Sequence, residues 1–125
     1  MKTTPSPVIA CMPVTADGRQ LDPRWGRAAH VAIARIERGA ITGWEVIAVG
    51  WDALHDVGTE GGHHARVARF LLEHHVQVVV ANHMGPPMEQ MLHQMRLAVH
   101  LGAGGDARAA VLAAVSGHAG GFLVN

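Results

Sequence analysis

The stretch His30–Val49, HVAIARIERGAITGWEVIAV, decides how the rest of this chain is arranged. Residues 30–37 and 44–49 are two runs rich in valine, isoleucine and alanine, as is typical of β-strands. Arg38-Gly39 between them is a turn signal. The stretch therefore predicts a hairpin of two antiparallel strands.

The elements around this hairpin alternate between strand and helix in the order β-β-β-α-β-α-β-α. Because the hairpin inverts the second strand, the other four strands can all point the same way. We therefore predict an α/β fold with a mixed five-stranded sheet and helices packed on it. The remaining strands are expected at residues 8–12, 76–81 and 97–101. One helix is expected at residues 63–74, and a second begins at Pro86. A third helix is expected at residues 107–115, with Asp106 as its N-cap and Gly117 as the residue that ends it.

The composition indicates one domain and excludes several classes of function. Of 125 residues, 49% are hydrophobic and 16% are charged, which predicts a single folded domain over residues 8–125 after a tail at residues 1–7. The formal net charge is +0 and aromatic residues are only 4%, so we expect no nucleic-acid binding. No run approaches the ~20 apolar residues of a membrane span, which leads us to expect a cytoplasmic protein.

Glycine-rich segments predict where a ligand would bind. Parallel strands end at the same edge of a sheet, and ligands of open α/β sheets bind there. Three such segments follow strands and lead into helices: Gly61-Gly62, Gly85 and Gly104-Gly105. Helix N-termini carry unpaired N–H groups and a positive dipole end, so we expect this edge to favour an anion. Tight turns alone are the other explanation for these glycines.

Histidine is abundant, with 10 residues, and three of these histidines fall at the predicted edge. His63 and His64 begin a helix, and His83-Met84 follows a strand, so their imidazoles and thioether are candidate ligands of a soft or borderline metal. We expect the three histidines to lie close together, with His63 and His83 outside the core. Cys11, the single cysteine, is a weaker candidate because it lies inside a strand, where a small buried hydrophobe is the alternative. No standard zinc spacing or nucleophile motif is present.

Four segments in chain order resemble the dinitrogenase iron–molybdenum cofactor biosynthesis family. The first, LDPRWGRA, has Trp25 where the family often has Phe; we expect it to be ordered, with Trp25 buried. The segments are residues 21–28 (LDPRWGRA), 61–68 (GGHHARVA), 81–86 (ANHMGP) and 102–111 (GAGGDARAAV). The match spans almost the whole chain.

The resemblance implies a ribonuclease H-like fold and a non-catalytic role. Known members of the family bind iron–sulfur or iron–molybdenum cluster precursors and carry them between assembly proteins. By this resemblance, the partners would be metallocluster assembly or acceptor proteins, with a homodimer possible. Since such clusters are anionic, Arg27 and the glycine-rich segments would supply charge complementarity.

Two other functions stay open at this stage. A ribonuclease H-like hydrolase would need clustered carboxylates to hold Mg²⁺, and the strands at residues 8–12 and 76–80 contain none. A regulatory or scaffold homologue that has lost cluster binding is the second alternative.

Overall fold

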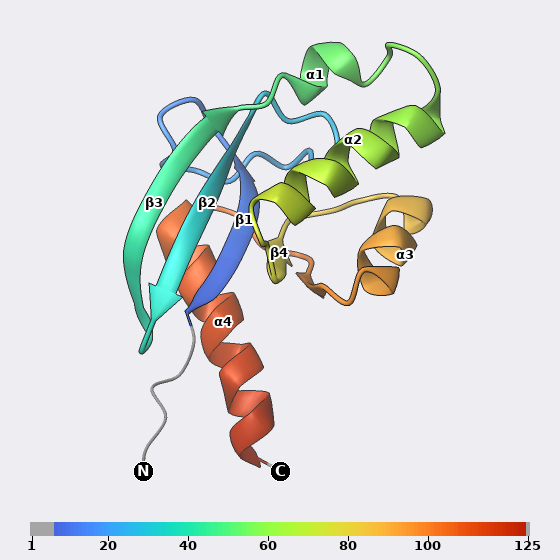
Figure 1. Cartoon of the computed structure of the whole chain (residues 1–125). Coiled ribbons are helices and arrows are strands. Elements are labelled where there is room, and N and C mark those ends of the chain that lie inside the picture. The colour runs from blue at the N-terminus through green and yellow to red at the C-terminus, as the bar shows by residue number, and fades with distance from the viewer. Residues whose placement is uncertain (1–6, 125) are drawn as a thin grey trace.

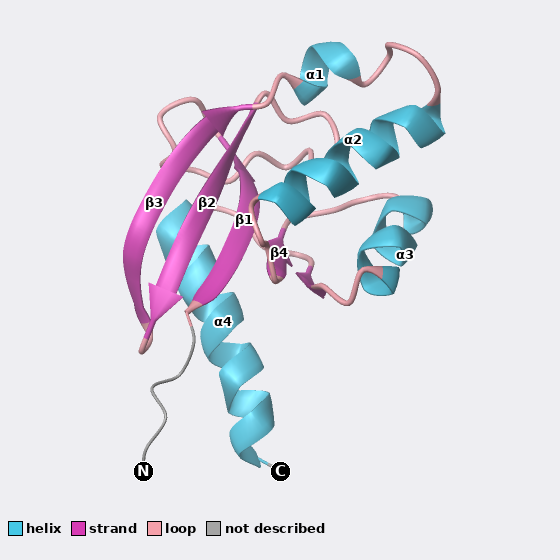
Figure 2. Cartoon of the chain, in the orientation of Figure 1, coloured by secondary structure: helices cyan, strands magenta, loops and turns pink. Residues whose placement is uncertain are grey.

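The computed structural model describes the backbone of residues 7–124 and the side chains of residues 7–116. It contains five strands and four helices in this part of the chain (Figure 2). The elements are β1 (Val8–Val14), β2 (His30–Glu37), β3 (Ala40–Ala48), α1 (Trp51–Leu54), α2 (Glu60–Glu73), β4 (Val78–Val80), α3 (Pro86–Gln94), β5 (Ala98–His100) and α4 (Ala107–Val124).

The strands form one mixed sheet in the order β3-β2-β1-β4-β5, which confirms the predicted α/β class. β2 runs antiparallel to both β1 and β3, whereas β4 runs parallel to β1 and to β5. The four strands β1, β3, β4 and β5 therefore point the same way, as the hairpin predicts. Their carboxyl ends meet at one edge of the sheet.

The hairpin turn explains why β3 is longer than predicted. Glu37 pairs with Ala40, so the loop contains only Arg38 and Gly39, with φ angles of 55° and 79°. Two positive φ values are typical of a type I′ turn, whose twist matches the twist of the strands that it joins. The residues directly after Gly39 therefore pair at once, and β3 begins at Ala40 instead of Trp44.

The sheet separates two hydrophobic cores, because side chains alternate along each strand. On one face, Ala10, Met12 and Val14 of β1 pack with α4. On the other face, Cys11 packs in a cluster with α2 and α3 side chains such as Val67. Figure 1 shows α4 on one side of the sheet and α2 and α3 on the other.

Several element bounds differ from the prediction. Residues 51–54, between the predicted strand at 44–49 and the predicted helix at 63–74, form the short helix α1, and Trp51 of this helix is buried. The backbone of α4 continues to Val124 and does not end at Gly117. The side chains of residues 117–125 and the tail at residues 1–6 lie outside the part of the chain that the structure describes. Within the described residues, no helix is long and apolar enough to cross a membrane.

Candidate functional site

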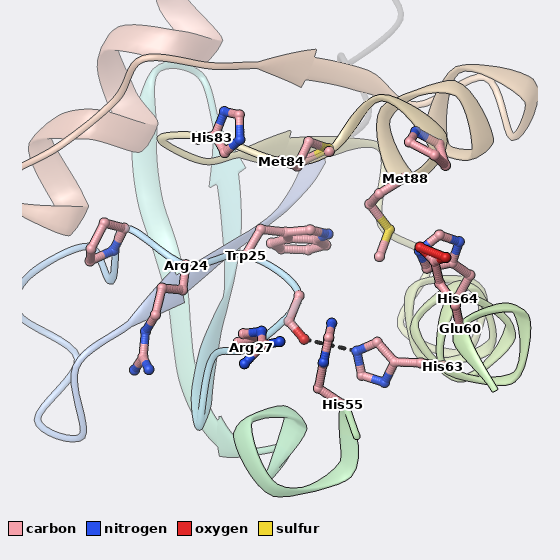
Figure 3. A pocket seen from close by; sticks show the side chains of 14 residues that line it. Arg24, Trp25, Arg27, His55, Glu60, His63, His64, His83, Met84 and Met88 are labelled. Carbon is pink, nitrogen blue, oxygen red and sulfur yellow. Dashed lines mark hydrogen bonds between the residues drawn. The ribbon is translucent and has the colours of Figure 1, made fainter. Parts of the chain in front are cut away.

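A cavity of about 330 Å³ lies where the loop after β1 meets the beginnings of α2 and α3 (Figure 3). Four separate segments supply its walls, and imidazole, thioether and guanidinium groups gather on them. The lining residues are Pro23, Arg24, Trp25, Gly26, Arg27, His55, Glu60, His63, His64, His83, Met84, Gly85, Pro87 and Met88.

The loop after β1 is ordered, as predicted for the segment at residues 21–28. The backbone N–H of Asp22 donates to the carbonyl of Pro13 at 2.9 Å, and Arg24 forms an isolated parallel bridge with His83. Trp25 is 1% exposed, which confirms its predicted burial, and its ring meets that of Trp51 edge-on at 5.4 Å. The loop is therefore a fixed wall of the cavity.

His63 is the buried centre of a hydrogen-bonded chain, and its predicted exposure is wrong. Its side chain is 2% exposed, and its Nε2–H donates to the carbonyl of Gly26 at 2.8 Å. Its Nδ1 accepts from Arg66 at 2.7 Å, and the same guanidinium nitrogen donates to the carbonyl of Leu54 at 3.2 Å. Both ring nitrogens are thus occupied, so coordination of a metal would break one of these bonds.

Burial also holds His63 in its neutral form. Desolvation lowers the pKa of His63, and the nearby His55, Arg66 and His64 add to this effect. The chain of hydrogen bonds requires the neutral ring as well, since Nδ1 can accept from Arg66 only while it carries no proton. In this structure, His63 fixes the loop against α2 instead of facing the cavity as a free ligand.

The cavity is lined by two arginines whose side chains are held in place to different extents. Arg24 donates to both carboxylate oxygens of Asp22, at 3.2 and 3.1 Å, which orients it firmly. Arg27 lies 3.8 Å from Asp56, and more than half of each side chain is exposed. A long exposed pair of this kind contributes little to stability. Arg27 is therefore the guanidinium with more freedom to turn, and its role in binding an anion stays a prediction.

Asp56 also interacts with His55, which lines the cavity. A hydrogen bond with His55 at 3.1 Å lowers the pKa of Asp56, and the charge of Arg27 lowers it further. The rings of His55 and His63 are 5.0 Å apart. His55 thus joins α1 to the cavity wall.

His64, His83, Met84 and Gly85 all line the cavity, so the structure brings these predicted site residues together. His83 is exposed and His64 is half-buried, whereas Met84 is only 6% exposed. Two imidazoles with solvent access are suited to bind a metal that arrives from outside. Their proposed role as ligands stays a prediction.

The start of α2 differs from the predicted glycine-rich loop. Thr59 is the N-cap, and its side chain accepts a hydrogen bond from the backbone N–H of Gly62 at 2.9 Å. Gly61 and Gly62 therefore form the first turn of the helix and are exposed, away from the cavity lining. Only Glu60 of this turn reaches the cavity together with His63 and His64.

The other two helix N-termini offer less to an anion than predicted. Pro86 and Pro87 occupy the first turn of α3, and proline has no backbone N–H. At α4, the carboxylate of Asp106 accepts from the N–H of Ala109 at 2.9 Å, which confirms Asp106 as a capping residue. The positive groups that line the cavity are therefore the side chains of Arg24 and Arg27, beside the carboxylate of Glu60, and not the helix ends.

Three predicted site residues lie elsewhere. The carbonyl of Gly105 accepts from the N–H of Leu21 at 2.8 Å, so this glycine anchors the loop after β1. Gly104 lines a separate groove beside α4. Cys11 is fully buried in the core, and burial raises the pKa of its thiol, which disfavours the thiolate that a metal requires. The structure therefore does not place any of the three at the cavity.

Sequence reasoning missed several lining residues. Arg24 belongs to the LDPRWGRA segment and could have been found beside Arg27. His55, Glu60 and Met88 also line the cavity, although the Met88 side chain is only 5% exposed. Among the described residues, no group of three His, Cys, Asp or Glu side chains is close enough to hold a metal ion.

Comparison with known proteins places this geometry in a family. The sequence model of the dinitrogenase iron-molybdenum cofactor family matches residues 7–117. The chain belongs to this family. The match includes every residue that lines the cavity and confirms the resemblance of the four segments. The family's description associates this member with the iron–molybdenum cofactor or a related cluster, and thus with an accessory role. None of the curated proteins compared with the chain matches it.

Solved structures share the fold of this family member. The crystal structure of PH0822 superposes with a TM-score of 0.71 at 17% identity, over 88% of this chain and 90% of that one. The apo form of the orange protein from Desulfovibrio gigas gives 0.71 at 19% identity, over 92% of each chain. The NMR structure of the Thermotoga protein TM1290, assigned to the DUF35 family, gives 0.65 at 20% identity, over 88% and 89%. At such identities the likeness shows the fold alone.

Proposed function

We propose that this protein is a non-catalytic carrier that holds an anionic metal–sulfur cluster in the cavity and passes it to other proteins. The cluster, of iron–sulfur or iron–molybdenum type, is cargo and is released again. One observation carries the proposal: a single cavity collects two arginines, the exposed imidazole of His83, the half-buried imidazole of His64 and two thioethers from four segments of a family member.

The donor set suits a cargo of this kind. His64 and His83 can supply nitrogen ligands, and Met84 and Met88 can supply soft sulfur ligands. Arg27 provides a mobile positive charge that complements an anion. Because the described residues contain no cluster of three metal ligands, the cargo would be held by few direct bonds, which favours transfer over permanent storage.

The wider setting is part of the same proposal. The strand order β3-β2-β1-β4-β5 with an antiparallel β2 supports the ribonuclease H-like fold that the resemblance implies. We propose that the protein acts in the cytoplasm with metallocluster assembly or acceptor proteins as partners. A homodimer is the oligomeric state to test first.

The test is anaerobic incubation with ferrous iron and sulfide, followed by measurement of protein-bound iron and of the absorption spectrum. The double variant His64→Ala with His83→Ala should lose most of the bound iron. The matched control is His75→Asn with His93→Ala, two exposed histidines away from the cavity, and it should load like the wild type. Asparagine is chosen because the φ of His75 is 56°, which asparagine tolerates.

The pH dependence of loading gives a second check. Protonated imidazole cannot bind a metal, so loading should weaken on acidification. Equal loading of the two double variants would reject His64 and His83 as ligands. Absence of any iron in the wild-type protein would reject the proposed function itself.

A further inference from the structure

Trp25 carries a buried hydrogen-bond donor without a partner. Its side chain is 1% exposed and lines the cavity. Among the buried side-chain nitrogen and oxygen atoms of residues 7–116, Trp25 Nε1 is the one that has no hydrogen-bond partner. The indole nitrogen can only donate. Buried donors in proteins are nearly always paired, so an unpaired one requires an explanation.

Two contacts hold the Trp25 indole in the position where its nitrogen has no partner. The edge-on contact with Trp51, at 72° between the ring planes, fixes the orientation of the Trp25 ring. The bridge between Arg24 and His83 fixes the backbone beside it. The donor is therefore held in place without an acceptor.

Met88 is the flexible group on the side to which this donor points. In Figure 3 the indole nitrogen lies at the end of the ring that faces Met88. The methyl carbon of Met88 is 3.7 Å from the position that a Cβ on Gly26 would take, so the side chain reaches the loop. Methionine is unbranched and adapts its rotamers easily. A ligand in the cavity can therefore displace it and reach the donor.

We propose that the Trp25 Nε1–H donates a hydrogen bond to the cargo, to a sulfide or oxo atom on the surface of an anionic metal–sulfur species. This inference rests on the proposed function and adds a positioning residue to it. A buried donor interacts strongly with a negatively charged acceptor. Trp25 would thus orient the cargo, while Arg27 balances its charge.

Nuclear magnetic resonance of the indole N–H groups tests this contact directly. The chain has three tryptophans, Trp25, Trp44 and Trp51, which give three indole signals in a ¹⁵N-labelled protein. Trp25→Phe assigns the first of them, since it removes that signal. The probe is tetrathiomolybdate, a diamagnetic anion with sulfide at its surface. On addition of the probe, the Trp25 N–H signal should move downfield while that of Trp44 stays in place.

The affinity for the same probe gives an independent readout. Trp25→Phe keeps a buried aromatic ring and removes the donor, so it should weaken binding by about tenfold, which corresponds to about 1.4 kcal/mol. The control is Trp44→Phe, because Trp44 packs against the core on the opposite face of the sheet. It should bind the probe as tightly as the wild type does.

The outcomes separate this inference from the proposed function. Binding by the wild type with an unmoved Trp25 signal, or equal affinities of the two phenylalanine variants, would overturn the role of Trp25 and leave the carrier function standing. Absence of binding by the wild type would count against both. Since the signal shift is measured on the wild-type protein, the test does not depend on how well Trp25→Phe folds.

Discussion

Replacing His63 with alanine should destabilise the protein far more than a surface histidine change would. The variant removes the donor to the Gly26 carbonyl and the acceptor for Arg66, at a site that is only 2% exposed. A buried neutral hydrogen bond contributes about 1 kcal/mol, and one to a charged group about 1.5–3 kcal/mol. We therefore expect a loss of about 2–4 kcal/mol in the free energy of unfolding, or about 10 °C in Tm.

The same hydrogen bonds predict how stability depends on pH. Because the pKa of His63 is lowered in the folded state, the unfolded chain binds the proton more readily. The stabilising contribution of neutral His63 is complete above the unfolded pKa of about 6.5, and it is lost as the pH falls towards the lower folded pKa. The hydrogen bond with His55 lowers the pKa of Asp56, so this carboxylate titrates outside the window.

Urea denaturation at pH 7.5 and pH 5.5, followed by circular dichroism, measures both effects. The wild type should lose stability between these pH values, and His63→Ala should lose less. The control is His64→Ala, the next residue of the same helix, which is half-buried and should change stability by about 0.5 kcal/mol or less. If His63→Ala were as stable as His64→Ala at pH 7.5, the proposed stabilising role of this hydrogen-bonded chain would be wrong.

Two further pairs of variants check the packing of the fold by the same denaturation measurement. Gly18→Ala should cost about 3 kcal/mol or more, since the φ of Gly18 is 75° and a Cβ would lie 2.6 Å from Val46. Gly39 has a similar φ of 79°, but a Cβ there would meet nothing within 4 Å, so Gly39→Ala should cost about 1 kcal/mol. A larger loss at Gly39 would contradict this reasoning. Leu92→Ala empties a fully buried position of α3 and should cost about 2–5 kcal/mol, while Leu72→Ala, 66% exposed, should be nearly neutral. Equal costs for the two leucines would show that α3 does not pack as described.

The hydrophobic pattern of the sequence was sufficient to predict the sheet. Residues 8–12 and 78–80 are short apolar runs, and such runs specify strands through local side-chain chemistry. The hairpin at Arg38-Gly39 set β2 antiparallel to β3, because a two-residue turn permits only antiparallel pairing, and this left the other four strands able to point the same way. Strand direction in turn predicted that His64, His83 and Met84 would share one edge, and they line one cavity.

Local signals at the helix ends were more ambiguous. Glycines 61 and 62 indicated a loop because glycine disfavours helices, but Thr59 caps the helix three residues earlier and compensates for them. The N-cap pattern was present in the sequence at Thr59. Whether the Thr59 cap or the two glycines determine where the helix begins depended on how α2 packs against the sheet.

Only the tertiary structure decided which predicted residues face the cavity. The two helices α2 and α3 connect parallel strands and lie on one face of the sheet, as the handedness of such connections requires, whereas α4 packs on the other face (Figure 1). Gly104 therefore lies beside α4, away from the cavity, although it follows a strand of the same direction.

The sequence by itself determined the strands, their directions, the edge at which a site forms and the family to which the chain belongs. The tertiary structure decided that His63 is a buried support, that Arg24 and His55 join the cavity, and that the indole of Trp25 is left without an acceptor. The physical reason is that strand propensity and turn geometry act over a few neighbouring residues. Burial and hydrogen-bond pairing depend instead on segments far apart in the chain that meet only after folding.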